Sequence, residues 1–124
     1  MSELTEPQKA YLAGLIDGEG SISIVRATNH YNRKSRRIYH QLRVSVFNTD
    51  HKMMAWVKET LGFGHIAHRK QQSERHKPSY AYQATALNAL EIVKAVYPYL
   101  VTKKKQADVA FIFGTTVRKR LNNA

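Results

Sequence analysis

The first candidate for chemistry is Glu19, an acid that directly follows a helix-forming segment with small residues at one-turn spacing. Ala10, Gly14 and Gly18 lie four residues apart, so they share one face of that helix. Glycine inside a helix costs about 0.5–1 kcal/mol relative to alanine, so this face should gain from close approach to another helix. A second copy of the chain offers the matching face, which predicts a two-fold homodimer. The alternative to a dimer is that both glycines belong to the end of a helix that stops early.

A crossing of two such helices would bring two Glu19 carboxylates together at its end. Like charges at short range are unfavourable unless a cation lies between or beside them. Mg²⁺ prefers oxygen ligands and is commonly bound by one or two carboxylates plus a phosphate. With the dimer, the position would therefore suit a divalent metal ion. Without the dimer, Glu19 would be an ordinary solvated surface acid.

Other metal and nucleophile chemistries are excluded or disfavoured. The chain has no cysteine, which excludes disulfides, thiolate zinc sites and cysteine nucleophiles and favours an intracellular location. The six histidines form no His-x-x-x-His pair. We therefore interpret them as surface residues or nucleic-acid contacts.

The charge balance indicates a polyanionic partner. The 124 residues include 20 Lys and Arg against 9 Asp and Glu, a net charge of +11, and nucleic acid is the first candidate for so basic a chain. Hydrophobic residues make up 43% of the sequence, enough for a packed core, and the length fits a single domain over residues 1–124. No apolar run approaches the ~18 residues of a membrane span, and the acidic N-terminus does not resemble a signal peptide. We expect no membrane partner.

The elements that must position these residues alternate between helical and strand patterns. Helices are predicted from a Thr5 N-cap to about Gly18, from Asn48–Asp50 to Gly62, from Leu87 to near Pro98, and from Lys103 to Leu121. Strands are predicted over 21–25 (or as far as 28), 38–47, 65–71 and 79–85, with a long polar turn over Arg26–Arg37. The order α-β-β-α-β-β-α-α predicts an α+β fold with one antiparallel sheet and its helices on one face.

The sheet face away from the helices should be polar and available to a ligand. In the second strand one face carries Ile38, Leu42, Val44 and Val46, with His40 as its one polar member, and the other face carries Tyr39, Gln41, Arg43, Ser45 and Phe47. Tyr80 and Tyr82 could face either side. A two-stranded ribbon fits the DNA major groove. Candidate DNA contacts are Ser23, Arg26, Asn29, Tyr31, Asn32, Arg36, Gln41, Arg43, Arg69, Lys70, Gln71 and Lys77.

Four blocks of the chain together resemble the LAGLIDADG homing endonucleases. They are Leu12–Gly20 (LAGLIDGEG), Phe47–Asp50 (FNTD), Leu61–Gly64 (LGFG) and Pro98–Ala107 (PYLVTKKKQA). Their order and spacing are compatible with the family over almost the whole chain. The family divides into single-motif homodimers and two-motif monomers, and this chain carries one motif. The resemblance therefore implies a homodimer with the family's curved antiparallel sheet.

The resemblance also implies roles for named residues. The last acid of the motif, more often Asp in the family, corresponds to Glu19 as the metal ligand, with the Gly18 carbonyl beside the metal. A polar residue at the start of the second helix, which orders solvent near the attacking water, corresponds to Asp50. The basic residue of the last block, which stabilises the scissile region, corresponds to Lys103, the first of three consecutive lysines.

The activity implied by the resemblance is Mg²⁺-dependent hydrolysis of both strands of a long pseudo-palindromic double-stranded DNA site, leaving 3′ overhangs. Mn²⁺ or Ca²⁺ could occupy the same site, Ca²⁺ without cleavage. The alternatives are a non-cleaving maturase that binds intron RNA and a DNA-binding regulator of the same fold. Such a protein acts inside the cell at the genome that encodes it, in an organelle or in archaeal, bacterial or phage-infected cytoplasm.

Overall fold

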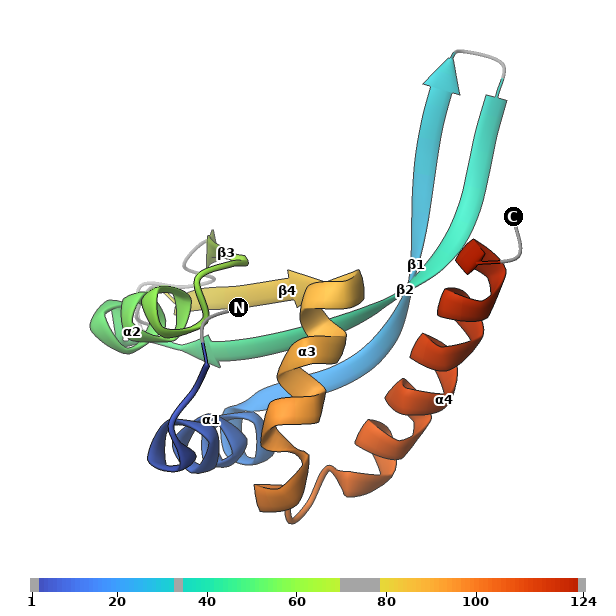
Figure 1. Ribbon diagram of the computed structural model, residues 1–124. Helices are drawn as coiled ribbons and strands as arrows, with labels where there is room; N and C mark the ends of the chain where they lie inside the picture. Colours follow the sequence, from blue (N-terminus) through green and yellow to red (C-terminus); the bar gives the residue numbers. More distant parts are fainter. Residues whose placement is uncertain (1–2, 33–34, 70–78, 123–124) are drawn as a thin grey trace.

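The computed structural model describes residues 3–32, 35–69 and 79–122 and arranges them as a four-stranded antiparallel sheet covered by helices (Figure 1). The sheet order is β1-β2-β4-β3, formed by β1 (Gly20–Asn32), β2 (Ser35–Asn48), β3 (His65–Arg69) and β4 (Ser79–Thr85). The helices are α1 (Glu6–Glu19), α2 (His51–Leu61), α3 (Ala86–Val96) and α4 (Lys104–Asn122), with a 3₁₀ helix η1 (Tyr97–Tyr99) before α4. The predicted α+β class and element order are confirmed.

Local capping chemistry explains where the first two helices begin and end. The Gln8 backbone N–H donates to Thr5 Oγ1 at 3.3 Å, and the Thr5 backbone N–H donates to Gln8 Oε1 at 2.9 Å, which is a reciprocal capping box. Asp50 caps α2, and Gly62 ends it with a left-handed φ of 80°, a conformation that favours glycine. These are the ends that the sequence predicted.

The core lies between the sheet and the helices. Val44 and Val46 of β2 are buried against side chains from α1, α2 and α3. Tyr82 of β4 is fully buried, and its hydroxyl donates to the Phe63 carbonyl at 2.8 Å. Tyr80, two residues earlier on the same strand, packs against the same core, so both tyrosines face the helices. No helix of the described ranges is both long and apolar enough to cross a membrane.

The first hairpin corrects one prediction. The segment Arg26–Arg37, predicted as a long turn, is mostly strand: β1 continues to Asn32, β2 begins at Ser35, and Asn29 pairs with Arg37. In Figure 1 the end of this hairpin rises beyond the helices. Polar residues can occupy both faces there because backbone pairing, not burial, holds the two strands together. Ile38, predicted on the buried face, is accordingly 46% exposed.

Candidate functional site

The small-residue face of α1 is open in the single chain. Ala10, Gly14 and Gly18 are exposed, whereas Leu12 and Ile16 on the same helix are buried. A Cβ atom added at Gly14 or Gly18 would meet nothing within 4 Å. The described part of the chain thus gives no packing reason for glycine at these two positions, and the face remains available to another helix.

Asn48 links Glu19 to the start of α2. Its Nδ2 donates to Glu19 Oε2, while its Oδ1 accepts the backbone N–H of Asp50 at 2.8 Å. Together the two contacts define which end of the amide faces the carboxylate. Asp50 Oδ1 accepts the backbone N–H groups of Lys52 at 2.9 Å and Met53 at 3.3 Å. Glu19 and Asp50 are therefore joined through one side chain, and one oxygen of Asp50 is engaged as a helix cap.

Asp17 attaches the segment 101–103 to the last turn of α1. Its Oδ2 accepts the Val101 backbone N–H at 2.7 Å, and its Oδ1 accepts the Thr102 hydroxyl at 3.0 Å and the Lys103 backbone N–H at 3.1 Å. The Lys103 ammonium donates to the Asp17 main-chain carbonyl at 2.7 Å. A cation at this end of a helix is also favoured by the helix dipole. All three predicted catalytic residues therefore meet around the C-terminal end of α1.

The same contacts determine the charge state of Asp17. Partial burial is the largest single influence and raises its pKa, but the hydrogen bonds from Val101, Thr102 and Lys103 together lower the pKa below its ordinary value. The carboxylate is therefore ionised at neutral pH. Hydrogen bonds to an ionised acceptor are roughly twice as strong as neutral ones, so the attachment of residues 101–103 is firm.

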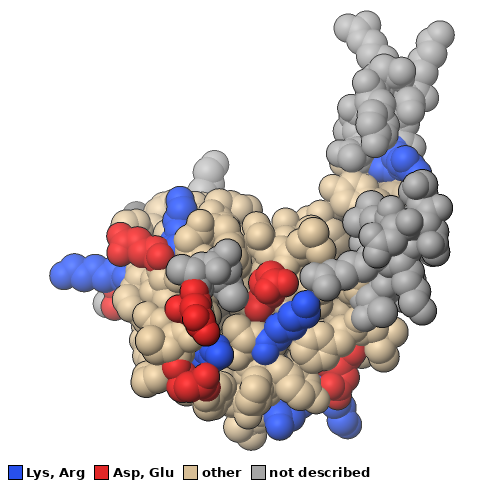
Figure 2. All heavy atoms as spheres, viewed as in Figure 1, with Lys and Arg blue, Asp and Glu red and all other residues tan. Residues whose placement is uncertain are grey.

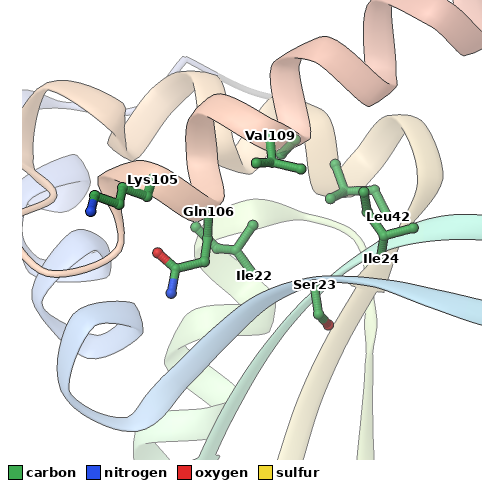
Figure 3. Close-up of a pocket in the computed structure, with 8 residues that line it drawn as sticks. Ile22, Ser23, Ile24, Leu42, Lys105, Gln106 and Val109 are labelled. Carbon is green, nitrogen blue, oxygen red and sulfur yellow. The ribbon is translucent and has the colours of Figure 1, made fainter.

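The sheet face opposite the helices carries several of the predicted DNA contacts. Ser23 pairs with Arg43, which pairs in turn with Thr85, and Figure 3 shows Ser23 pointing away from α4 while Ile22, Ile24 and Leu42 point toward it. Gln41, two residues from Arg43, falls on this polar face by strand alternation. The Arg43 Nε atom is buried without a hydrogen-bond partner among the described residues.

The remaining predicted contacts divide into three groups. Arg26 pairs with His40, and by alternation it lies on the opposite face from Ser23, so it does not share the polar face. The backbones of Asn29, Tyr31, Asn32 and Arg36 lie in the first hairpin and that of Arg69 lies in β3, with side chains outside the described set. Lys70, Gln71 and Lys77 lie outside the described residues.

The helix-covered side offers a different environment. Figure 2 shows acidic and basic side chains interspersed on the face that it presents, so this face is not uniformly basic. A cavity of about 370 Å³ lies between α4 and β1, and its lining includes Ile22, Leu42 and Val109 but no carboxylate (Figure 3). The lining is mostly apolar, with Lys105 and Gln106 at its polar side, and it offers no carboxylate to a metal ion, so the end of α1 remains the candidate site.

The donor set at the end of α1 suits a hard divalent cation. Glu19 and Gly18 are exposed there, and they offer a carboxylate and a main-chain carbonyl, the oxygen ligands that Mg²⁺ prefers. Within residues 3–32, 35–69 and 79–122, no cluster of three or more His, Asp or Glu side chains could hold a metal ion. A divalent ion held by Glu19 and the Gly18 carbonyl would take its remaining ligands from water or from an added phosphate, as Mg²⁺ commonly does.

Comparison with known families identifies the family of this chain. The family model described as LAGLIDADG endonuclease matches residues 12–112. The chain belongs to the LAGLIDADG endonuclease family. The matched range contains the C-terminal part of α1, the whole sheet and the residues at Glu19, Asp50 and Lys103.

Solved structures of LAGLIDADG proteins share the fold at low identity. The homing endonuclease I-CvuI, solved with its target in the presence of Ca, matches with a TM-score of 0.66 and 20% identity over 85% of this chain and 64% of its own. The archaeal intron-encoded homing endonuclease I-Vdi141I, complexed with DNA, matches with a TM-score of 0.59 and 20% identity over 82% and 63%. The meganuclease I-SmaMI, bound to uncleavable DNA, matches with a TM-score of 0.69 and 18% identity over 92% and 38%. The chain thus spans under two thirds of each relative. No curated protein matches.

Two residues of this LAGLIDADG site were not among the predicted site residues. Asn48 lies in the FNTD block and Asp17 lies in the LAGLIDGEG block, but their side chains act across separations of 29 and 84–86 residues. Local sequence patterns do not predict contacts between residues so far apart in the chain. Both residues are polar and lie in blocks that match the family, yet the family resemblance assigned them no role. That combination is the signal that could have identified them.

Proposed function

We propose that this chain is one half of a homodimeric, metal-dependent homing endonuclease that hydrolyses both strands of a pseudo-palindromic DNA site and leaves 3′ overhangs. The observation that carries the proposal is the meeting of Glu19, Asp50 and Lys103 around the end of α1, directly beside an open small-residue helix face. The substrate would be double-stranded DNA of the genome that encodes the protein.

The homodimer is supported by the open face of α1 and by the lengths of the relatives. Ala10, Gly14 and Gly18 form an exposed stripe that would allow two copies of α1 to cross at short range. A single copy of this fold occupies 38% of I-SmaMI, which leaves length in that protein for a second copy. A two-fold axis through the α1 crossing would bring both Glu19 residues to the same region of the DNA.

The chemistry follows from the charges and hydrogen-bonding groups at the site. Mg²⁺ bound by Glu19 with the Gly18 carbonyl would supply an activated water and charge stabilisation at the phosphate. The Lys103 ammonium uses one of its three donors on the Asp17 carbonyl, and its other donors would stabilise the negative charge that develops on the phosphate. Asp50, held at the start of α2, would order the solvent.

DNA recognition is assigned to the polar sheet face. Ser23, Gln41 and Arg43 share this face, where arginine favours guanine and glutamine favours adenine in the major groove. Basic residues around this face would contact the phosphates.

Selection of cleaved sites from a randomised DNA duplex library in Mg²⁺ tests the proposal. We expect one pseudo-palindromic consensus cut on both strands with 3′ ends protruding. Glu19→Gln should abolish cleavage while DNA binding in Ca²⁺ is retained, and Glu59→Gln, an exposed acid on α2, is the matched control. Full cleavage by Glu19→Gln would refute the assignment of the metal site. Tight binding of intron RNA with no DNA cleavage in Mg²⁺ or Mn²⁺ would favour the maturase instead.

A further inference from the structure

Asp17 is an acid of the motif that the proposed chemistry leaves without a role. Its carboxylate accepts three hydrogen bonds from residues 101–103, at 2.7 to 3.1 Å. A surface acid that served solubility alone would not converge on three consecutive residues from the far end of the chain.

Asp17 holds Lys103 at two points, the backbone N–H and the side-chain ammonium. Its backbone N–H donates to Asp17 Oδ1 at 3.1 Å, and its ammonium donates to the Asp17 carbonyl at 2.7 Å. The same residue therefore fixes both the root and the tip of this long side chain. An unrestrained lysine carries up to about 2 kcal/mol of rotamer entropy. A Lys103 side chain that is already held at both ends would lose less of this entropy when its ammonium binds a phosphate.

We propose that Asp17 is a positioning residue that holds the Lys103 ammonium at the C-terminal end of α1, the end that carries Glu19, through the segment 101–103, an inference that rests on the proposed nuclease function. Both carboxylate oxygens are needed. Oδ2 serves Val101, and Oδ1 serves Thr102 and Lys103. An amide at position 17 would turn one acceptor into a donor facing an N–H or O–H donor, so asparagine is not an equivalent replacement.

A double-mutant cycle separates positioning from general structural support. Single-turnover cleavage of the selected target is measured for wild type, Asp17→Asn, Lys103→Met and the double variant, with DNA affinity measured separately in Ca²⁺. We expect Asp17→Asn to lower the cleavage rate by about 10- to 100-fold, as supporting residues around metal sites typically do, with the Kd changed less than about two-fold. In the Lys103→Met background the further loss should fall below about three-fold, because the two residues act as one unit. Multiplicative losses would overturn the proposal.

Asp108→Asn is the matched control. Asp108 is exposed on α4 and accepts the Tyr97 hydroxyl at 2.8 Å, so its replacement also removes a carboxylate contact from the same part of the fold without touching residues 101–103. It should leave the cleavage rate unchanged. If Asp17→Asn does not fold, Thr102→Val, which removes one donor to Asp17, should lower the rate in the same direction by a smaller factor.

A second measurement does not depend on cleavage. Amine-reactive acylation of the DNA-free protein, followed by mass spectrometry, compares Lys103 with its neighbours Lys104 and Lys105, which are exposed. Lys103 should be protected in wild type, and Asp17→Asn should raise its labelling alone. Equal labelling of Lys103 in both proteins would overturn the positioning role even if the wild-type protein cuts DNA. Protection lost in Asp17→Asn together with an inactive wild type would refute the nuclease and leave the positioning contact standing.

Discussion

Gly14→Ala should change chain stability and dimer affinity in opposite directions. Gly14 lies inside α1 in a helical conformation, is exposed, and has open space where a Cβ would stand. Alanine in a helix interior gains about 0.5–1 kcal/mol over glycine, and nothing in the described chain opposes that gain. For a domain of this size the melting temperature of the dissociated chain should rise by about 2–4 °C.

The homodimer should respond the other way. Two added methyl groups would enter the crossing of the two α1 helices, and overpacking of a close contact costs about 1–3 kcal/mol. The dimer Kd should therefore rise by about 5- to 150-fold. Because a partner that binds only the folded chain raises its apparent stability, the concentration dependence of the wild-type melting temperature should be largely lost in the variant.

Sedimentation equilibrium and thermal melts over a range of protein concentrations provide the assay. Asn88→Ala, an exposed replacement on α3, raises helix propensity away from α1 and should leave the dimer Kd unchanged. An unchanged Kd for Gly14→Ala would refute the crossing of α1 with its copy. A lower melting temperature at the dilute limit would contradict the open surroundings of Gly14.

Three further outcomes are expected. DNA binding should weaken steeply with salt, because six phosphate contacts would give a slope of about −5 in log Kobs against log salt concentration, and a slope near zero would contradict an electrostatic interface. The Tyr99 hydroxyl and the Lys9 ammonium lower the pKa of Glu6 from its ordinary value of 4.5, so urea unfolding should show wild type more stable than Glu6→Gln at pH 7 and the difference vanishing as the pH falls through that lowered pKa. Gly64→Ala should destabilise the chain by about 1–3 kcal/mol in denaturant melts, because φ is 91° and the new Cβ would collide with the Tyr82 ring, whereas Gly14→Ala should not.

The parts of the fold that were predictable are those specified by local chemistry. The Thr5–Gln8 capping box, the Asp50 cap and the left-handed Gly62 each depend on residues within a few positions of one another, and sequence spacing reports such contacts directly. The alternation of Leu42, Val44 and Val46 likewise predicted the buried face of β2, because that part of the strand has one side against the helices.

The prediction failed where the strands are not packed against helices, because the alternation of polar and apolar residues arises only where one face of a strand is buried. The polar segment Arg26–Arg37 looked like a turn, yet pairing continues through it because strands outside the helix layer need no apolar face. Ser45 was placed on the polar face, yet it is 2% exposed. It sits on the central strand β2 between Ser21 and Gln83, so neighbouring strands shield a side chain too short to reach past them.

The candidate site was predictable only through family blocks. Glu19, Asp50 and Lys103 are separated by 31 or more positions in the sequence, and periodicity cannot indicate that they meet. Asn48 and Asp17 join them through side-chain contacts whose geometry depends on the finished fold. The proposed catalytic roles and the dimer remain predictions, whereas the hydrogen bonds that bring these residues together are described by the structure.

The connection between Asp17 and residues 101–103 also orders events in time. It spans 84–86 residues, and the Tyr99–Glu6 contact spans 93. During synthesis α1 and Glu19 leave the ribosome first, but Lys103 joins them only when most of the domain has been made, since long-range contacts close last. A truncated or unfinished chain therefore has the acid without the lysine. Premature products of translation would therefore lack the Lys103 side of the proposed site.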